Sequence, residues 1–282
     1  MLSITPSIRA VIETALNEDL GHGDITTLAL IPPDLRGIGS IMAKSDGIIS
    51  GVEASLEVFR ILDPLITTRI LIPDGSEVSS SDIVAQIDGS IAHILNGERV
   101  ALNLLQRLSG ISTETNKYVT AIAGTKAHII DTRKTIPGLR ELEKYAVRMG
   151  GGHNHRFNLA DGILIKDNHI AILKAQHLNI KDIIEQARQK SPHTLKIEIE
   201  VETIDEAMEA FKASADVILL DNMNVEEMKQ VVDLIQGKCL LEASGGINLE
   251  TVKAVANTGV DLISVGALTH SVTALDISLE MG

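Results

Sequence analysis

The sequence predicts an α/β and α+β protein: an incomplete parallel α/β barrel of about six strands, with a smaller N-terminal α+β domain that carries an antiparallel sheet. Two observations predict it. From residue 129 onward, short apolar runs alternate with amphipathic stretches, which is typical of parallel strands joined by helical crossovers. Before residue 110, the apolar runs lie close together and Gly, Pro, Asp and Ser turns separate them, which is typical of antiparallel strands.

Composition limits the class of protein. The 282 residues are 44% hydrophobic, which is enough for one barrel-sized domain and a smaller one. A net charge of −13 and the absence of Trp disfavour nucleic acid as a partner, because nucleic-acid sites need basic stripes and stacking platforms. The single Cys239 lies in an apolar run and is expected to be a buried thiol. With no membrane-length apolar run and no signal-type N-terminus, a cytoplasmic protein is expected.

The N-terminal domain, residues 1–110, is expected to begin with an amphipathic helix over 6–17. A turn-rich loop over 18–27 follows, and its His22 and Asp24 are interpreted as structural, because two ligands in a glycine loop do not indicate a metal site. Strands are predicted at 39–44, 47–50, 68–72 and 83–87, with a helix at 52–61. Helices over 98–108 and 113–123 are expected next, separated by Ser109 and Gly110, and each arginine of the first, Arg99 and Arg107, is expected at the surface.

The large domain, residues 111–270, should contain the barrel, and residues 271–282 are expected to pack back on the first domain. Strands are predicted at 129–130, 163–165, 197–201, 217–220, 240–241 and 262–265, and helices at 180–189, 204–212, 225–235 and 249–258. A complete barrel has eight strands. The six predicted here therefore indicate an incomplete one.

Cations collect between Thr132 and Arg156 in this acidic chain. This segment contains six Lys or Arg and two Glu, which gives it a net charge of +4. Arg133 and Lys134 follow one predicted strand, and Lys166 ends the next. Barrels bind ligands at strand ends, where arginine forks bind carboxylate or phosphate and lysine adds a point charge. We therefore predict a site for a small polyanion made by Arg133, Lys134, Arg156 and Lys166.

A helix is predicted to follow Pro137 and Gly138 and to end at the glycines 150–152. Arg140, Lys144 and Arg148 are spaced by four residues on it, with glutamates nearby. We interpret these three cations as a solvated helix face rather than as part of the site.

Carboxylates follow at later strands. Glu198, Glu200 and Glu202 alternate with apolar residues, so all three should point to one face of their strand. If that face is the packed lumen of a barrel, three carboxylates can be accommodated there only near the mouth or beside cations. Asp221 ends the next strand, where it can either serve a site or cap the following helix.

Small residues form the turns after the last two strands. Such turns let backbone N–H groups approach a phosphate, and barrel enzymes hold phosphates at this place. Together they predict a phosphate site made by Ser244, Gly245, Gly246, Val265, Gly266 and Ala267.

Two stretches are long and specific: TRKTIPGLRELEKYAVRMGGGHNHR at 132–156 and DGILIKDNH at 161–169. With EDLGHGDIT, ERVALNLLQRLSGIST, VILLDNM, EASGGI and VGALTH, they cover nearly the whole chain. The sequence resembles the quinolinate phosphoribosyltransferase family, also called nicotinate-nucleotide pyrophosphorylase (carboxylating). The resemblance implies transfer of the phosphoribosyl group of phosphoribosyl pyrophosphate to quinolinate, with release of pyrophosphate and CO₂, in de novo NAD biosynthesis.

The resemblance also implies residue roles. Lys134, Glu200 and Asp221 would act in catalysis, and Mg²⁺ would arrive with phosphoribosyl pyrophosphate, with no direct metal ligand assigned. The resemblance further implies a homodimer, or a higher oligomer, whose active sites are shared between subunits. Arg99 would reach into the active site of the partner subunit. The substrate-binding set implied is Arg99, Thr132, Arg133, Lys134, His155, Arg156, Lys166, Glu200, Asp221, Ser244, Gly245, Gly246, Val265, Gly266 and Ala267.

Two other functions stay open. One is a phosphoribosyltransferase for another acceptor, such as nicotinate or the substrate of a molybdenum-associated relative. A monocarboxylate acceptor should not need the full set of Arg99, Arg133, His155 and Arg156. The other is an anion-sensing barrel without activity, for which carboxylates beside a polyphosphate would bring no benefit.

Overall fold

The computed structural model describes residues 2–282, which form two compact units that interleave along the chain. The first unit takes the residues up to 116 together with 135–151 and 268–282, and the second takes 117–134 and 152–267. The helix after the first cation-rich strand end therefore belongs to the N-terminal unit, although the cations themselves belong to the second.

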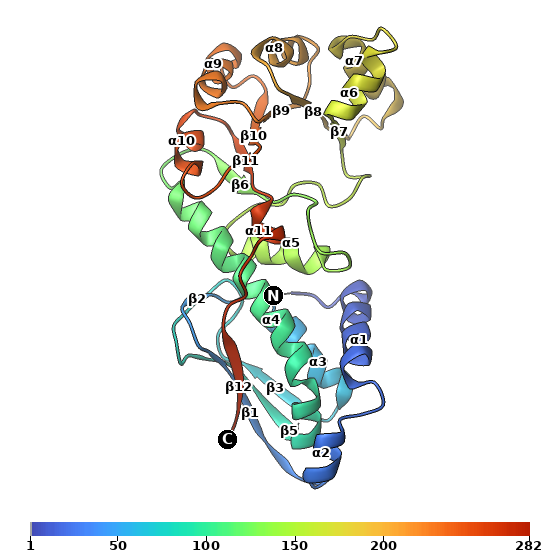
Figure 1. Ribbon diagram of the computed structural model, residues 1–282, viewed down its shortest axis with the longest axis vertical. Helices are drawn as coiled ribbons and strands as arrows, with labels where there is room; N and C mark the ends of the chain where they lie inside the picture. Colours follow the sequence, from blue (N-terminus) through green and yellow to red (C-terminus); the bar gives the residue numbers. More distant parts are fainter. Residues whose placement is uncertain (1) are drawn as a thin grey trace. The chain divides into compact units, whose positions relative to one another are not determined.

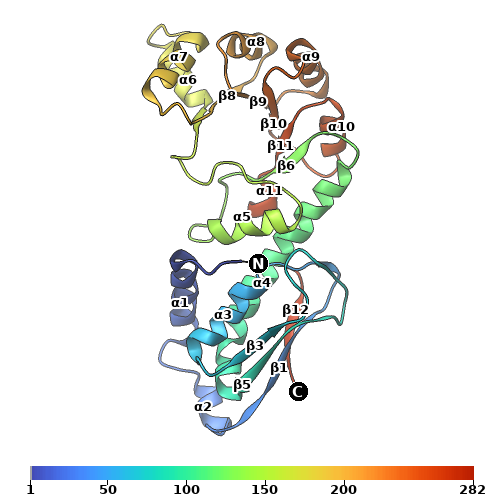
Figure 2. The same cartoon turned by 180° about the vertical axis from the view of Figure 1, so that it is seen from behind.

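The first unit contains an antiparallel sheet, which within residues 2–282 has the strand order β12 (Ile277–Met281), β1 (Arg36–Ala43), β5 (Ile83–Ser90) and β3 (Thr67–Ile70). Strand β12, from the C-terminus, runs beside β1 in both views (Figures 1 and 2). A separate short pair joins β2 (Gly47–Ile48) to β4 (Glu77–Val78). The predicted α+β character of this part of the chain is confirmed.

Three helices begin this unit: α1 (Pro6–Leu20), α2 (Ile25–Leu30) and α3 (Val52–Leu62). The loop predicted over 18–27 is wrong at both ends, since α1 runs to Leu20 and α2 begins at Ile25. Asp24 accepts hydrogen bonds from the backbone N–H groups of Thr26 and Thr27, at 2.9 and 3.1 Å, so it caps α2. The structural interpretation of Asp24 is confirmed.

Helix α4 (Ile91–Ala121) is continuous, so the predicted break at Ser109 and Gly110 is wrong. The Ser109 hydroxyl accepts a hydrogen bond from the Ser50 N–H at 3.0 Å. A Cβ at Gly110 would lie 2.2 Å from the carbonyl oxygen of Thr273. These two small residues therefore allow other segments to approach the helix closely, and their local preference for a turn is overridden by packing.

Helix α5 (Arg140–Met149) lies where it was predicted, but the expectation of a solvated cationic face is wrong for Lys144, which is 1% exposed. Neighbouring Glu143 is also fully buried. It accepts two hydrogen bonds from Arg107, at 2.6 and 2.8 Å, and Arg107 also donates to the Thr269 carbonyl. The surface position expected for Arg107 is therefore wrong too. Burial of a charge needs such pairing, which residue spacing alone does not reveal.

The second unit contains a parallel sheet with six strands among the described residues, in the order β6 (His128–Ile130), β11 (Leu262–Ser264), β10 (Leu240–Ser244), β9 (Val217–Asp221), β8 (Ile197–Val201) and β7 (Ile163–Ile165). The helices on its outer face are α6 (Asp167–Lys174), α7 (Ile180–Lys190), α8 (Ile204–Lys212), α9 (Val225–Ile235) and α10 (Val252–Asn257) (Figure 1). The short α11 (Ala267–His270) follows β11. The predicted incomplete barrel is confirmed.

The sheet does not close between β6 and β7, which form its two edges. These two strands are consecutive in the sequence, but their cation-rich ends are at opposite edges of the sheet and are not direct neighbours in it. The edge of β6 is extended by residues 152–154, since His153 pairs with Ile130 in a parallel bridge. This pairing brings the polar segment after α5 toward the carboxyl end of the sheet.

Cys239 is buried, as predicted, and its thiol donates to the Ala215 carbonyl at 3.2 Å. Burial raises the pKa of this thiol to about 11. None of the helices within residues 2–282 has the length and apolar character needed to cross a membrane.

Candidate active site

A cavity of about 380 Å³ lies at the carboxyl ends of the parallel strands. This is the end at which barrel folds bind their ligands. It gathers most of the predicted polar side chains from the ends of β6 to β11. Its lining is Thr132, Arg133, Lys134, His155, Arg156, Leu164, Lys166, Glu200, Leu219, Asp221, Glu242, Ser244 and Ser264.

The remaining predicted residues do not line this cavity. Gly245 and Gly246 directly follow Ser244, and the segment 265–267 directly follows Ser264, so these turns adjoin the lining residues in the chain. Arg99 lies on α4 in the first unit, with its side chain 61% exposed and 3.8 Å from Glu98. The phosphate-binding role of the turns and the cross-subunit role of Arg99 stay predictions.

Two guanidinium groups share the cationic part of the cavity. Arg156 donates to the Gly162 carbonyl at 3.2 Å, and burial, followed by the neighbouring Arg133 charge, lowers the pKa of Arg156. The buried Nε of Arg133 has no hydrogen-bond partner within the described part of the chain. An open buried donor next to a second cation is costly unless an anion binds there.

The carboxylates lie across the cavity. Burial raises the pKa of Glu200, the nearby Asp221 charge raises it further, and Lys166, with its Nζ 3.3 Å from the carboxylate, opposes both. Asp221 does not cap the next helix: the N-cap of α9 is Asn224, whose side chain accepts from the Glu227 N–H at 2.9 Å. The capping alternative for Asp221 is therefore wrong, and its carboxylate lines the cavity.

Asp131 positions the segment that carries His155. It is fully buried at the end of β6 and accepts hydrogen bonds from the Asn154 amide at 2.6 Å and from the His155 backbone N–H at 2.9 Å. Sequence reasoning assigned it no role. The signal in the sequence was the position of Asp131, which directly follows an apolar strand and precedes a cation-rich segment.

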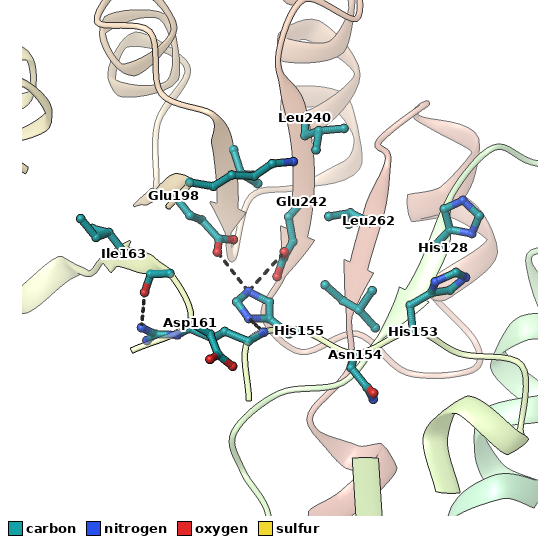
Figure 3. Close-up of a pocket in the computed structure, with 15 residues that line it drawn as sticks. His128, His153, Asn154, His155, Asp161, Ile163, Glu198, Leu240, Glu242 and Leu262 are labelled. Atoms are coloured by element: carbon teal, nitrogen blue, oxygen red, sulfur yellow. Dashed lines mark hydrogen bonds and ion pairs between the residues drawn. The ribbon is translucent and has the colours of Figure 1, made fainter. Parts of the chain in front are cut away.

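His155 and Glu242, which line this cavity, form a group with Glu198 that we call the lumen cluster (Figure 3). The Nε2 atom of His155 lies 3.0 Å from a Glu198 oxygen and 3.7 Å from a Glu242 oxygen. Burial, and then the adjacent Glu198 charge, raise the pKa of Glu242 well above its ordinary range. Neither glutamate was predicted as a site residue, although the alternating carboxylates of β8 already indicated that Glu198 shares a face with Glu200.

The lumen cluster also borders a second cavity of about 370 Å³ at the opposite ends of the strands. Residues at the starts of several strands line it, among them His128, Leu240 and Leu262 (Figure 3). The cluster therefore lies between two cavities, and only the cavity at the carboxyl ends contains Glu200 and Asp221.

Comparison with known proteins agrees with this architecture. Residues 24–109 match the family model "Quinolinate phosphoribosyl transferase, N-terminal domain", and residues 111–280 match its C-terminal domain. The "Probable nicotinate-nucleotide pyrophosphorylase [carboxylating]" of Bacillus subtilis is 45% identical over 264 residues, which are 94% of this chain and 90% of that protein. A tobacco "Quinolinate phosphoribosyltransferase [decarboxylating] 2b, mitochondrial" is 40% identical over 98% of this chain and 83% of its own length.

Solved structures show the same likeness. NadC from Streptococcus pyogenes has a TM-score of 0.95 and 40% identity, with 100% of this chain and 99% of that chain covered. The nicotinate-nucleotide pyrophosphorylase of Francisella tularensis has a TM-score of 0.93 and 37% identity over 99% and 98% of the two chains. This chain belongs to the quinolinate phosphoribosyl transferase family.

Proposed function

We propose that this protein transfers the phosphoribosyl group of phosphoribosyl pyrophosphate to quinolinate and releases CO₂ and pyrophosphate, forming nicotinate mononucleotide in de novo NAD biosynthesis. The observation that carries the proposal is one cavity in which a pair of guanidinium groups faces two carboxylates, in a chain of this family. The pairing suits a substrate set with one aromatic dianion and one polyphosphate.

Quinolinate has two adjacent carboxylates, and the guanidinium groups of Arg133 and Arg156 match them in charge and geometry. The open Nε donor of Arg133 supports this placement. The 5-phosphate of the second substrate would approach the turns after Ser244 and Ser264, where backbone N–H groups can reach it. Lys134 and Lys166 would lie against the pyrophosphate, and Mg²⁺ would enter as part of this substrate.

The proposed reaction begins with departure of pyrophosphate, which takes the electron pair of its bond to C1 of the ribose. The positive charge that develops at C1 is stabilised by Glu200 and Asp221, and the quinolinate nitrogen then bonds to C1. The bond from ring carbon 2 to its carboxylate breaks next. Its electrons are accepted by the positively charged ring, CO₂ leaves, and a proton adds to that carbon.

The direct test is incubation of the purified protein with quinolinate, phosphoribosyl pyrophosphate and Mg²⁺, with detection of CO₂ and pyrophosphate. Equal amounts of both products are expected. A parallel reaction with nicotinate separates the nearest alternative, because turnover of nicotinate without turnover of quinolinate would overturn the proposal.

We also propose a cytoplasmic homodimer with shared sites, in which Arg99 completes the partner subunit's cavity. Arg99→Ala and Lys166→Ala should each be nearly inactive. When both are unfolded together and refolded in equal amounts, half of the dimers should be mixed, and each mixed dimer has one site with both residues intact. Activity should therefore recover to about a quarter of wild type, by the statistics of a closed two-fold assembly.

The control mixture pairs Arg99→Ala with the double variant Arg99→Ala/Lys166→Ala, which cannot form an intact site in any combination. It should stay inactive. If the test mixture, shown by mass to contain mixed dimers, is as inactive as this control, Arg99 acts within its own chain.

A further inference from the structure

We propose that Glu198 and Glu242 are positioning residues of this site: together they hold one proton, and Glu198 fixes the ring of His155 by accepting the hydrogen bond of its Nε2–H. This inference deepens the proposed function and rests on it for the identity of the substrate. It assigns a role to two buried carboxyl groups that do not take part in the proposed reaction.

The tautomer of His155 follows from its contacts. The backbone N–H of Arg156 donates to Nδ1 at 2.7 Å. A ring nitrogen that accepts a hydrogen bond carries no proton, so the ring proton is on Nε2. Nε2 lies 3.0 Å from a Glu198 oxygen, within hydrogen-bond distance, whereas the nearest Glu242 oxygen is 3.7 Å away. Glu198 is therefore the acceptor that orients the ring.

The same contacts decide between a proton and a metal ion. One imidazole and two carboxylates within 4.8 Å of one another resemble a ligand set. A metal would need the lone pair of Nε2, and a metal-binding histidine donates its other N–H to an acceptor. In this cluster the other nitrogen is itself the acceptor, so Nε2 is protonated and does not offer a lone pair. A proton on the carboxyl pair, rather than a metal ion, relieves the repulsion of the two carboxylates.

Burial requires that proton. Glu198 is 8% exposed and Glu242 is 1% exposed, and one oxygen of each has no hydrogen-bond partner among the described residues. Two adjacent buried carboxylates are unfavourable when both are ionised, whereas one shared proton makes an O–H···O bond. The proton belongs to Glu242, because it is the more deeply buried of the two and because both burial and the Glu198 charge raise its pKa.

The charge of the pair matters for anion binding. With one proton, the pair carries one negative charge, which attracts Arg156. Without this proton, the pair would carry a second negative charge close to the proposed dicarboxylate site, and that charge would repel the substrate. The other titratable or charged groups that line the two adjoining cavities are His128, Arg133, Lys134, His153, Arg156, Asp161, Lys166, Lys196, Glu200 and Asp221.

Two spectroscopic measurements test the arrangement without turnover. Nitrogen NMR of the histidine rings should show His155 with its proton on Nε2. Infrared spectra should show the C=O stretch of a protonated buried carboxyl group in the wild type and its loss in Glu242→Gln. A protonated Nδ1 with a bare Nε2, or an acid band that is absent from the wild type, would overturn the proposal.

Kinetics test the positioning role. Glu198→Leu removes the acceptor for the Nε2–H, so KM for quinolinate should rise about tenfold, the scale of one lost buried hydrogen bond, with a smaller change in kcat. Glu198→Gln keeps an acceptor oxygen and should restore most of the loss even if the leucine variant folds poorly. Equal KM values for wild type and both variants would contradict the proposal.

The pH profile tests the shared proton. The folded state binds this proton more tightly than the unfolded chain, whose carboxyl groups titrate near the ordinary value of 4.5. The free energy of unfolding should therefore fall as the pH rises above about 4.5 and up through the raised pKa of Glu242. KM for quinolinate should rise as the pH passes the raised pKa. Glu242→Gln should flatten both dependences, and profiles that match the wild type would refute the assignment.

Glu202→Gln is the matched control. It removes one carboxylate from the same segment, but Glu202 is exposed and lies outside the lumen cluster. It should leave the His155 tautomer and KM unchanged. If quinolinate is not a substrate at all, the proposed function fails, yet the NMR and infrared results still decide whether the cluster is arranged as inferred.

Discussion

Replacement of Gly245 by alanine should disturb the carboxylate side of the cavity through Asn222. Gly245 has φ +95°, and a Cβ there would lie 2.2 Å from the Asn222 side-chain oxygen and 2.8 Å from its backbone nitrogen. Asn222 is itself held at φ +53° and donates to Asp221 at 2.7 Å. The added methyl group can be accommodated only if Asn222 moves, and this movement displaces Asp221.

The expected magnitude has two parts. A non-glycine residue at positive φ costs about 1–2 kcal/mol, and overpacking adds about 1–3 kcal/mol. Gly237, at φ +72° with no atom within 4 Å of its Cβ position, isolates the first part. Gly237→Ala should therefore lose only about 1–2 kcal/mol of unfolding free energy. Gly245→Ala should lose about 2–5 kcal/mol, and its kcat/KM should fall on the order of a hundredfold, as for a misplacement of about 1 Å.

Urea unfolding measures the free energy of unfolding of each variant, and steady-state kinetics with quinolinate measures its kcat/KM. Gly237→Ala should keep wild-type kcat/KM, because its turn lies outside the cavity. If Gly245→Ala is no less stable than Gly237→Ala and equally active, Asn222 does not transmit the strain to Asp221, and the reasoning is refuted.

Two further predictions concern the charged groups. Glu200→Gln and Asp221→Asn keep shape and remove charge, so each should lower kcat by about tenfold to a thousandfold, as when one preorganised electrostatic group is lost; a wild-type kcat in Glu200→Gln would exclude this role. Arg133→Ala and Lys134→Ala should each cut turnover. For the exposed Lys134, the free energy of unfolding measured in urea should change by about 0.5 kcal/mol or less. Gross unfolding of either variant would indicate a structural role instead.

Much of the fold could be predicted from local patterns. The alternation of apolar strands and amphipathic helices after residue 129 predicted the six parallel strands, because strand and helix periodicities are properties of neighbouring residues. The cations at the ends of β6 and β7 were predicted for the same reason, since a polar residue directly after an apolar run marks a strand end. A long, specific resemblance supplied the family and the choice of Glu200 among three alternating glutamates.

The tertiary structure alone decided which side chains meet. No local pattern indicates that β6 and β7 are the two edges of the sheet, that α4 is unbroken at Gly110, or that Lys144 is buried. The lumen cluster combines Glu198, Glu242 and His155 from three distant segments, and its shared proton depends on their mutual distances and on their removal from water. Hydrogen-bond distance and desolvation arise only when the chain has packed, so they are determined by the folded arrangement and not by residue spacing.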